Sequence, residues 1–279
     1  MTIDYPSPTR AGSYLVAIIH NYDPYRNQQL EAELSRLMSE KPVAAEIKMA
    51  WVGYQPKLSP LKAHLRISRW LAQKNLSAKL ICRLYRTGRL KRLLWWAISW
   101  PLDLWSIYSS ARMSSLKASI EMQLTKKHMR AWEHFLDSEA SFLIVLEDDA
   151  RLNDHFISNV ADLIHSASLG SSPFIVSLCR DYELGELGIA QDISFFGERY
   201  IRFMTGAMNT TAGYVLNRSA ACLFLEGIDN DPRMKLLNSD FLINCLLLKN
   251  SPKVSCLHAM NALVTNSSVS GDTQTSIKG

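Results

Sequence analysis

Phe142-Leu143-Ile144-Val145-Leu146-Glu147-Asp148-Asp149-Ala150 is the stretch that decides the fold. Its five leading apolar residues predict a strand buried on both faces, because a strand with one exposed face would alternate apolar and polar residues. Strands of this kind belong to sheets that helices cover on both sides. Ligands of open α/β sheets bind beyond the C-terminal ends of the strands. A binding site is therefore expected where this strand meets its acids.

Three consecutive carboxylates, Glu147, Asp148 and Asp149, end the predicted strand. Side by side they repel one another, and they cost stability unless positive charge lies among them. A divalent cation is the simplest such charge, and hard oxygen ligands suit Mg²⁺ or Mn²⁺ bridged to a phosphate-bearing ligand. In a second interpretation the acids only cap the next helix, because carboxylates favour a helix N-terminus. The stretch alone leaves both interpretations open.

Length and composition place the chain among globular proteins. Its 279 residues are enough for one large α/β domain or two small ones. The residues 1–10 are polar and include two prolines, so no secretory signal is expected there. The five cysteines form no C-x-x-C pair, which argues against a disulfide framework or a zinc site and favours a reducing compartment.

The N-terminal part of the chain predicts strand, helix and strand over residues 13–19, 26–38 and 44–52. This order opens a parallel, doubly wound sheet. Such a sheet often holds a nucleotide at the end of its first strand, here near residues 20–26. No glycine-rich phosphate loop is present, so neither a Walker motif nor a dinucleotide fingerprint applies.

The C-terminal half continues with alternating elements. Further helices are predicted over 115–137, 152–164, 219–225 and 241–248, a strand over 174–178, and a loop over 185–197. His128 lies on one helix face with Trp132 and Leu136, and a lone histidine in a helix is more often structural than catalytic. Asp240 is in the first turn of a helix, where a carboxylate either caps the helix or points into a cleft as a general base.

A basic region interrupts this pattern. Residues 57–92 hold eleven lysines and arginines and no acid, and residues 93–105 then add four tryptophans. The apolar part is too short to span a bilayer. Three interpretations remain: a helical insertion with a solvated basic face, a nucleic-acid surface, and a surface that lies in an anionic lipid interface. The last is favoured, since each basic residue near an anionic leaflet contributes roughly 1 kcal/mol.

Several blocks, in this order, resemble glycosyltransferase family 25, the lipopolysaccharide and lipooligosaccharide glycosyltransferases that include β-galactosyltransferases. The blocks are the opening strand with Asp23 and Arg26, His128-Met129-Arg130-Ala131-Trp132, Leu146-Glu147-Asp148-Asp149-Ala150, Thr211-Ala212-Gly213-Tyr214-Val215-Leu216 with Ala220, Asp240 before a helix, and Gln274-Thr275-Ser276-Ile277. The Leu-Glu-Asp-Asp-Ala block is the most specific. Lys127 stands where the family usually has Ser, Asn238-Ser239 stand where it has Pro-Val, and residues 57–113 look like an insertion.

The resemblance implies a fold and a set of site residues. The fold is GT-A-type (Rossmann-like), with a mostly parallel sheet flanked by helices, in a single glycosyltransferase domain over residues 1–279 that carries the helical insertion 57–113. The expected site residues are Glu147 and Asp149 at the metal, Asp23, Arg26, Asp148 and Gly213 at the donor, and Asp240 as the general base, with His128 and Asp181 as the other candidates for that base.

The expected activity is transfer of a hexose, with inversion, to a lipid-linked saccharide such as a lipooligosaccharide core. UDP-galactose is the expected donor and Mn²⁺ or Mg²⁺ the expected metal. The enzyme is expected on the inner face of the bacterial cytoplasmic membrane, bound to anionic lipid and not to nucleic acid. The alternatives are a transferase that uses another nucleotide-sugar and an inactive module of the same fold that binds membrane or saccharide.

Overall fold

The structure is a computed structural model, and it describes residues 13–40, 46–53, 111–166, 172–179, 193–196, 200–203, 208, 210–251 and 253–266. Its helices are α1 (Pro24–Glu40), α4 (Ala111–Asp137), α5 (Phe156–Ser166), α6 (Arg218–Asn230), the 3₁₀ helix η2 (Pro232–Leu236) and α7 (Ser239–Lys249). Its strands are β1 (Tyr14–His20), β2 (Ile47–Gly53), β3 (Phe142–Glu147), β4 (Ala150–Leu152), β5 (Phe174–Ser177), β6 (Ile193–Phe196), β7 (Tyr200–Phe203), β8 (Gly213–Asn217), β9 (Ser255–Ala259) and β10 (Val264–Asn266).

A mixed sheet of eight strands forms the centre, in the order β2-β1-β3-β8-β5-β9-β7-β6. Its first three strands are parallel, and β8 runs antiparallel to both β3 and β5. Following the pairings along the sheet, only β8 and β7 oppose the common direction. The expectation of a mostly parallel sheet flanked by helices is confirmed at this level, and the GT-A assignment stays a prediction.

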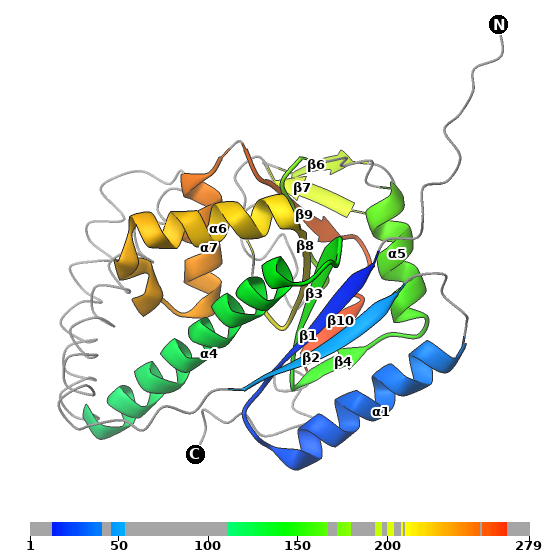
Figure 1. The fold of residues 1–279 in the computed structure, drawn as a ribbon, viewed down its shortest axis with the longest axis horizontal. Helices are drawn as coiled ribbons and strands as arrows, with labels where there is room; N and C mark the ends of the chain where they lie inside the picture. The colour runs from blue at the N-terminus through cyan, green and yellow to red at the C-terminus, as the bar shows by residue number, and fades with distance from the viewer. Residues whose placement is uncertain are drawn as a thin grey trace, which may run out of the picture.

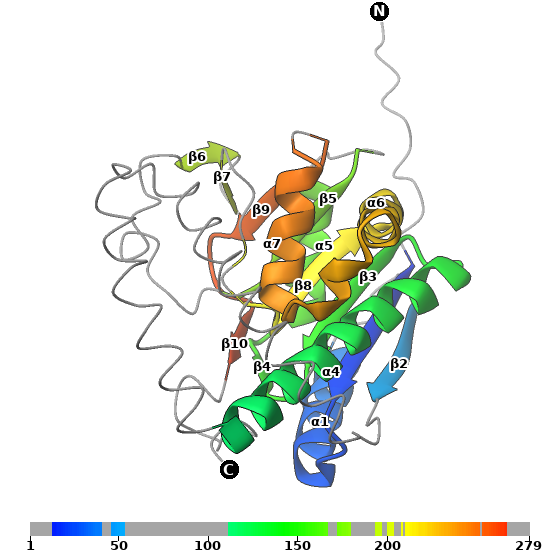
Figure 2. The same cartoon turned by 90° about the vertical axis from the view of Figure 1, so that its left-hand side faces the viewer.

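Helices cover both faces of the sheet (Figures 1 and 2). The buried side chains of the strands belong to two cores, one under each layer of helices. Along β3, Leu143 and Val145 pack in the core under α4, α6 and α7, whereas Ile144 and Leu146 pack in the core under α1 and α5. All four are at most 1% exposed. The continuous apolar run is therefore a strand buried on both faces, as predicted.

The acids do not cap a helix, which removes the second interpretation of the acidic stretch. Asp148 and Asp149 form a turn between β3 and β4, and the next helix begins only at Phe156. The predicted helix over 152–164 therefore began too early. The cause is a distant partner, because β4 pairs antiparallel with β10 near the C-terminal end of the described chain, and a local pattern cannot reveal such a pairing.

The predicted insertion 57–113 lies outside the described residues except for its last three, which begin α4. Its interpretation therefore stays a prediction. None of the described helices combines the length and the apolar character that crossing a membrane requires.

Candidate functional site at the C-terminal ends of β1 and β3

The carboxyl ends of the first three strands meet at one edge of the sheet. Ile19 of β1 pairs with Glu147 of β3, and His20 pairs with Gly53 of β2. The start of β8 reaches the same edge, since the Glu147 amide donates to the carbonyl of Ala212 at 2.9 Å. The register therefore gathers the β1–α1 turn, the acidic turn and the segment before β8.

Asp148 is buried and is held from the β1–α1 turn. One oxygen, Oδ1, accepts from Arg26 Nη1 at 3.3 Å, and Oδ2 accepts from the backbone N–H of Asn21 at 2.9 Å. Burial raises the pKa of Asp148 above its ordinary value, and these two donors oppose the rise. Asp23 completes the turn, because its Oδ1 accepts from the backbone N–H of Tyr25 at 3.0 Å at the start of α1. Asp23 and Arg26 thus fix the position of Asp148, and all three residues are predicted to bind the nucleotide-sugar donor.

Glu147 belongs to a buried chain of polar side chains on the opposite face of the sheet. Its Oε1 lies 3.3 Å from His128 Nε2 and accepts from Thr211 Oγ1 at 2.7 Å. His128 Nδ1 lies 2.9 Å from the hydroxyl of Tyr214, which also accepts from Trp132 Nε1 at 2.9 Å. Burial works to raise the pKa of Glu147, but the contacts with His128 and Thr211 outweigh it and lower that pKa.

The hydrogen-bonded series of side chains from Glu147 to Trp132 fixes the role of His128. Its side chain is 0% exposed, and both ring nitrogens are engaged. Since Trp132 can only donate to the Tyr214 oxygen, the Tyr214 hydroxyl can donate to Nδ1, which leaves the proton on Nε2 for Glu147. This assignment satisfies every member of the chain. The geometry therefore favours a role for His128 in orienting Glu147 and does not favour direct contact with a substrate.

Asp240 lies beyond Thr211 in the first turn of α7. Its neighbour Ser239 shares a hydrogen bond of 2.9 Å with Thr211 Oγ1, and Asn238 caps the helix by accepting from the Phe241 amide. Asp240 is therefore not the cap. Burial, followed by the charge of Glu147, raises the pKa of Asp240 to about 7. Among the residues that the structure describes, Asp240 Oδ1 is buried without a hydrogen-bond partner.

Sequence reasoning missed Lys127. This lysine is 0% exposed, and its Nζ donates to the carbonyl of His20 at 2.6 Å and to Asn21 Oδ1 at 2.5 Å. Burial lowers the pKa of Lys127, whereas Asp148 and Glu147 act to raise it. A signal was available in the sequence, because the apolar residues Ala131 and Phe135 follow at positions i+4 and i+8, on the same helix face as Lys127.

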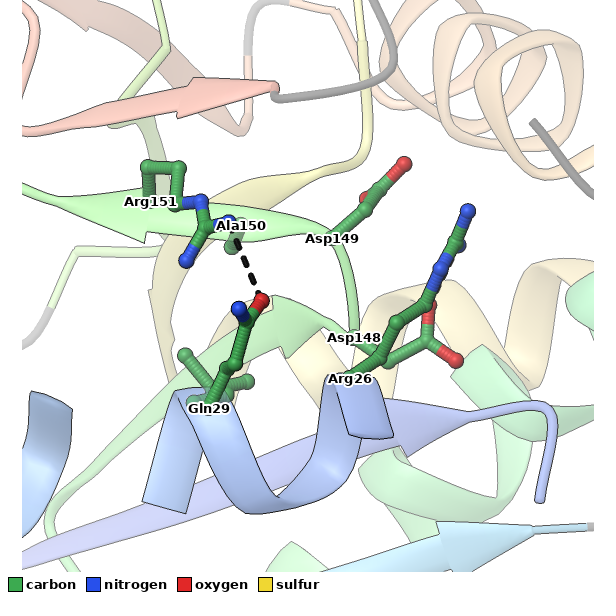
Figure 3. Close-up of a pocket in the computed structure, with 7 residues that line it drawn as sticks. Arg26, Gln29, Asp148, Asp149, Ala150 and Arg151 are labelled. Atoms are coloured by element: carbon green, nitrogen blue, oxygen red, sulfur yellow. Dashed lines mark hydrogen bonds and ion pairs between the residues drawn. The ribbon is translucent and has the colours of Figure 1, made fainter. Parts of the chain in front are cut away.

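Asp149 lines a shallow pocket beside α1, together with Arg26, Gln29, Leu30, Asp148, Ala150 and Arg151. Figure 3 shows Arg26 and Asp148 next to each other, and the Asp149 carboxylate directed away from Gln29 and Arg151. Arg151 is itself held by Gln29 and Glu33, at 3.0 Å each.

The carboxylates fit a divalent cation held partly by a ligand. The described residues form no group of three or more metal-binding side chains. Magnesium-type ions, however, are commonly held by one or two carboxylates together with substrate phosphates. Hydrogen bonds from His128 and Thr211 orient Oε1 of Glu147, and metal-ligating carboxylates are commonly oriented in this way. Asp149 lines the pocket. Glu147 and Asp149 stay the predicted metal ligands, the first within the buried polar chain and the second at the pocket beside α1.

Gly213 lies inside the sheet. A Cβ added there would come within 2.8 Å of Val264 Cγ2, and the Gly213 carbonyl accepts from the Leu178 amide at 3.0 Å. Packing between β8 and β10 thus explains this glycine without a ligand. Asp181, the remaining candidate for the general base, lies outside the described residues.

Comparison with known proteins gives one family. Residues 125–243 match the model of the family described as "Glycosyltransferase family 25 (LPS biosynthesis protein)". The matched segment runs from within α4 into α7, and it contains the acidic turn, the buried polar chain and Asp240. The resemblance inferred from the sequence is confirmed over this range, which is less than half of the chain. No curated protein gives a significant match.

Proposed function

We propose that this glycosyltransferase transfers a hexose from a nucleotide-sugar to a lipid-linked saccharide. UDP-galactose is the first candidate donor, and a lipooligosaccharide core is the candidate acceptor. The observation that carries the proposal is Asp240, a carboxylate with a pKa of about 7 and a buried oxygen that has no hydrogen-bond partner among the described residues. The matched segment contains both Asp240 and the acidic turn, and the family description supports lipopolysaccharide biosynthesis.

Asp240 would act as the general base. In an inverting transfer its carboxylate takes the proton of the acceptor hydroxyl while the hydroxyl oxygen attacks the anomeric carbon. The bond from that carbon to the diphosphate breaks on the opposite side, and the nucleoside diphosphate leaves with the bonding electrons. A base works best when its pKa is near the working pH, and a value of about 7 meets this condition.

The donor side would stabilise the leaving group. Mn²⁺ or Mg²⁺, held by Glu147 and Asp149, supplies positive charge to the departing diphosphate when it is bound. Arg26 lines the pocket together with Asp149, and Asp148 and Asp23 fix its position through contacts of 3.3 Å and 3.8 Å. His128 holds Glu147 in orientation through the chain to Tyr214 and Trp132.

The test is turnover of a panel of UDP-sugars with Mn²⁺, with donor hydrolysis standing in for transfer while the acceptor is unidentified. One sugar is expected to release UDP, and chelation is expected to stop the release. Asp240→Asn is expected to lower turnover at least 100-fold, the usual contribution of a general base, and to leave UDP binding intact. The wild-type rate is expected to rise with pH through about 7. Asp137→Asn, an exposed acid at the end of α4, is the matched control.

The other outcomes of this panel separate the alternatives. Turnover of a different nucleotide-sugar would change the donor and keep the enzyme class. Metal-dependent UDP binding without any turnover in the presence of lipid-linked acceptors would favour an inactive binding module. No UDP binding with or without metal would contradict the proposal.

The proposal places the enzyme on the inner face of the cytoplasmic membrane, held by the basic and tryptophan-rich residues 57–105. Charge and aromatic content support this placement. Sedimentation with vesicles tests it: the full chain is expected to pellet with anionic vesicles and not with zwitterionic ones, and deletion of residues 61–105 is expected to abolish pelleting. Unchanged pelleting of the deleted chain would remove the idea.

A further inference from the structure

The acidic turn has two cations of its own, one on each face of the sheet. Arg26 reaches Asp148 from α1 at 3.3 Å. Lys127 reaches the end of β1 from α4, on the other face, where its positive charge acts on both Asp148 and Glu147. The repulsion among the three acids, which from the sequence alone called for a metal, is therefore partly relieved by the protein itself.

The Lys127 ammonium lies inside the protein and not at its surface. Its side chain is 0% exposed, and both of its hydrogen-bond partners, the His20 carbonyl and Asn21 Oδ1, are acceptors. Burying an ammonium is costly unless it is paired and hydrogen-bonded. Here two acceptors bind the ammonium, and the charges of Asp148 and Glu147 oppose the lowering of its pKa by burial.

Charge counting then gives a consequence for metal binding. The acids Glu147, Asp148 and Asp149 carry three negative charges, and Arg26 with Lys127 returns two positive ones. These five groups together are left with a single negative charge and would carry two without Lys127, so the lysine weakens the attraction of the acidic turn for a divalent cation. A nucleoside diphosphate brings further negative charge and phosphate oxygens to the same edge, so metal and donor strengthen each other's binding.

We propose that Lys127 is an internal counter-ion that keeps the acidic turn from binding a divalent cation until the donor's diphosphate is present. The proposal rests on the proposed function, because it assumes a diphosphate donor at this edge. Lys127 is a positioning residue in this scheme: it holds the β1 end through His20 and Asn21 and sets the charge of the site. The metal then enters with the donor and leaves with the nucleoside diphosphate.

The test measures Mn²⁺ binding without nucleotide, by electron paramagnetic resonance or calorimetry, and UDP binding with and without Mn²⁺. In Lys127→Gln the amide can still donate to His20 but carries no charge. We expect Mn²⁺ alone to bind about tenfold more tightly to this variant than to the wild type, since one neighbouring charge shifts proton affinity of a carboxylate by that much or more. UDP without metal is expected to bind several-fold more weakly.

The opposite signs of these two effects distinguish the proposal from damage to the fold, which would weaken both. Lys253→Gln, an exposed lysine, is the matched control and is expected to change neither. If Lys127→Gln does not unfold cooperatively, Lys127→Met carries the test, because it keeps the buried stem without the charge.

Two failures can be told apart. If the wild type binds UDP with Mn²⁺ but neutral Lys127 variants bind free Mn²⁺ no more tightly, the counter-ion proposal is wrong and the proposed function stands. If the wild type binds no UDP under any condition, both proposals fail together.

Discussion

At the scale of single residues, the site depends on one carboxylate whose ionisation the fold opposes. The pKa of Asp240 is raised from 3.8 to about 7, first by burial and then by the charge of Glu147. Between these two values the folded chain keeps a proton that the unfolded chain has released. Folding stability therefore falls as pH rises from about 4 to about 7.

Asp240→Asn should remove this dependence on pH. Three pKa units correspond to on the order of 4 kcal/mol, so the variant should gain roughly that much stability relative to the wild type between pH 4 and pH 8. Urea unfolding at several pH values measures the difference. A difference that stays constant with pH, or the same trend in the Asp137→Asn control, would contradict the buried-acid account.

Tyr214 supplies a second prediction at this scale. Tyr214→Phe keeps the ring but leaves Trp132 Nε1 and His128 Nδ1 without the hydroxyl that each contacts at 2.9 Å. Unpaired buried groups cost about 1–3 kcal/mol, so the free energy of unfolding should fall by about 2 kcal/mol, with a loss of turnover because Glu147 is no longer oriented. Tyr14→Phe, at another buried tyrosine, should show neither loss in the same denaturant and turnover measurements.

At the scale of elements, Arg218 joins the start of α6 to the end of α4. Its guanidinium donates to the carbonyls of Leu136 at 2.6 Å, Ser138 at 2.7 Å and Phe135 at 3.0 Å. The last carbonyls of a helix lack intrahelical partners, and here Arg218 satisfies them together with Ser138, whose N–H and hydroxyl donate to the Phe135 carbonyl at 3.1 Å and 2.8 Å. Arg218 therefore helps to close α4 and links its end to the start of α6.

Arg218→Ala should lower the free energy of unfolding by about 3 kcal/mol, since several charge-assisted hydrogen bonds are lost at once. Arg218→Lys should restore only part of the lost free energy of unfolding, because an ammonium cannot reproduce the planar arrangement of guanidinium donors. Chemical denaturation measures both. Arg36→Ala, which breaks an exposed ion pair with Asp154, is the control and should cost less than 1 kcal/mol; equal costs for the two alanine variants would contradict the capping role.

Element prediction worked where the signal was local. The helix over 26–38 and the strand over 13–19 appear within two residues as α1 and β1, because periodicity and turn residues marked their ends. The strand β4 was not predicted, because three residues pair only with β10, more than 100 positions later. The direction of β8 was equally hidden, since its neighbours β3 and β5 both precede it in the chain.

Site prediction followed the same rule. The acidic turn was found because three charges end a buried run, and the family block contained Asp240 and His128. The sequence pattern could not show which groups offset the negative charge of Asp148. Its hydrogen-bond donors, Arg26 and Asn21, lie 122 and 127 positions away in the sequence. Lys127 was noted only as a departure from the family's usual Ser, and its burial beside the acids could not be seen in the sequence.

At the scale of the whole molecule, the segment that carries the family match is not expected to fold alone. Residues 125–243 include β3 and β5 but leave out β1 and β9, which are the parallel neighbours of those two strands. A fragment of these residues should show no cooperative unfolding by circular dichroism, whereas the full chain should unfold in a single transition. A fragment with a sharp transition would show that the segment is autonomous.

The antiparallel β8 also sets an order on synthesis. It is the strand that joins β3 to β5, yet it leaves the ribosome after both. Until Asn217 has emerged, β3 has an open edge and β5 has neither of its neighbours, because β9 follows β8 in the chain. Open strand edges are templates for association with other chains, so chains that end before residue 217 are expected to aggregate more readily than the full chain.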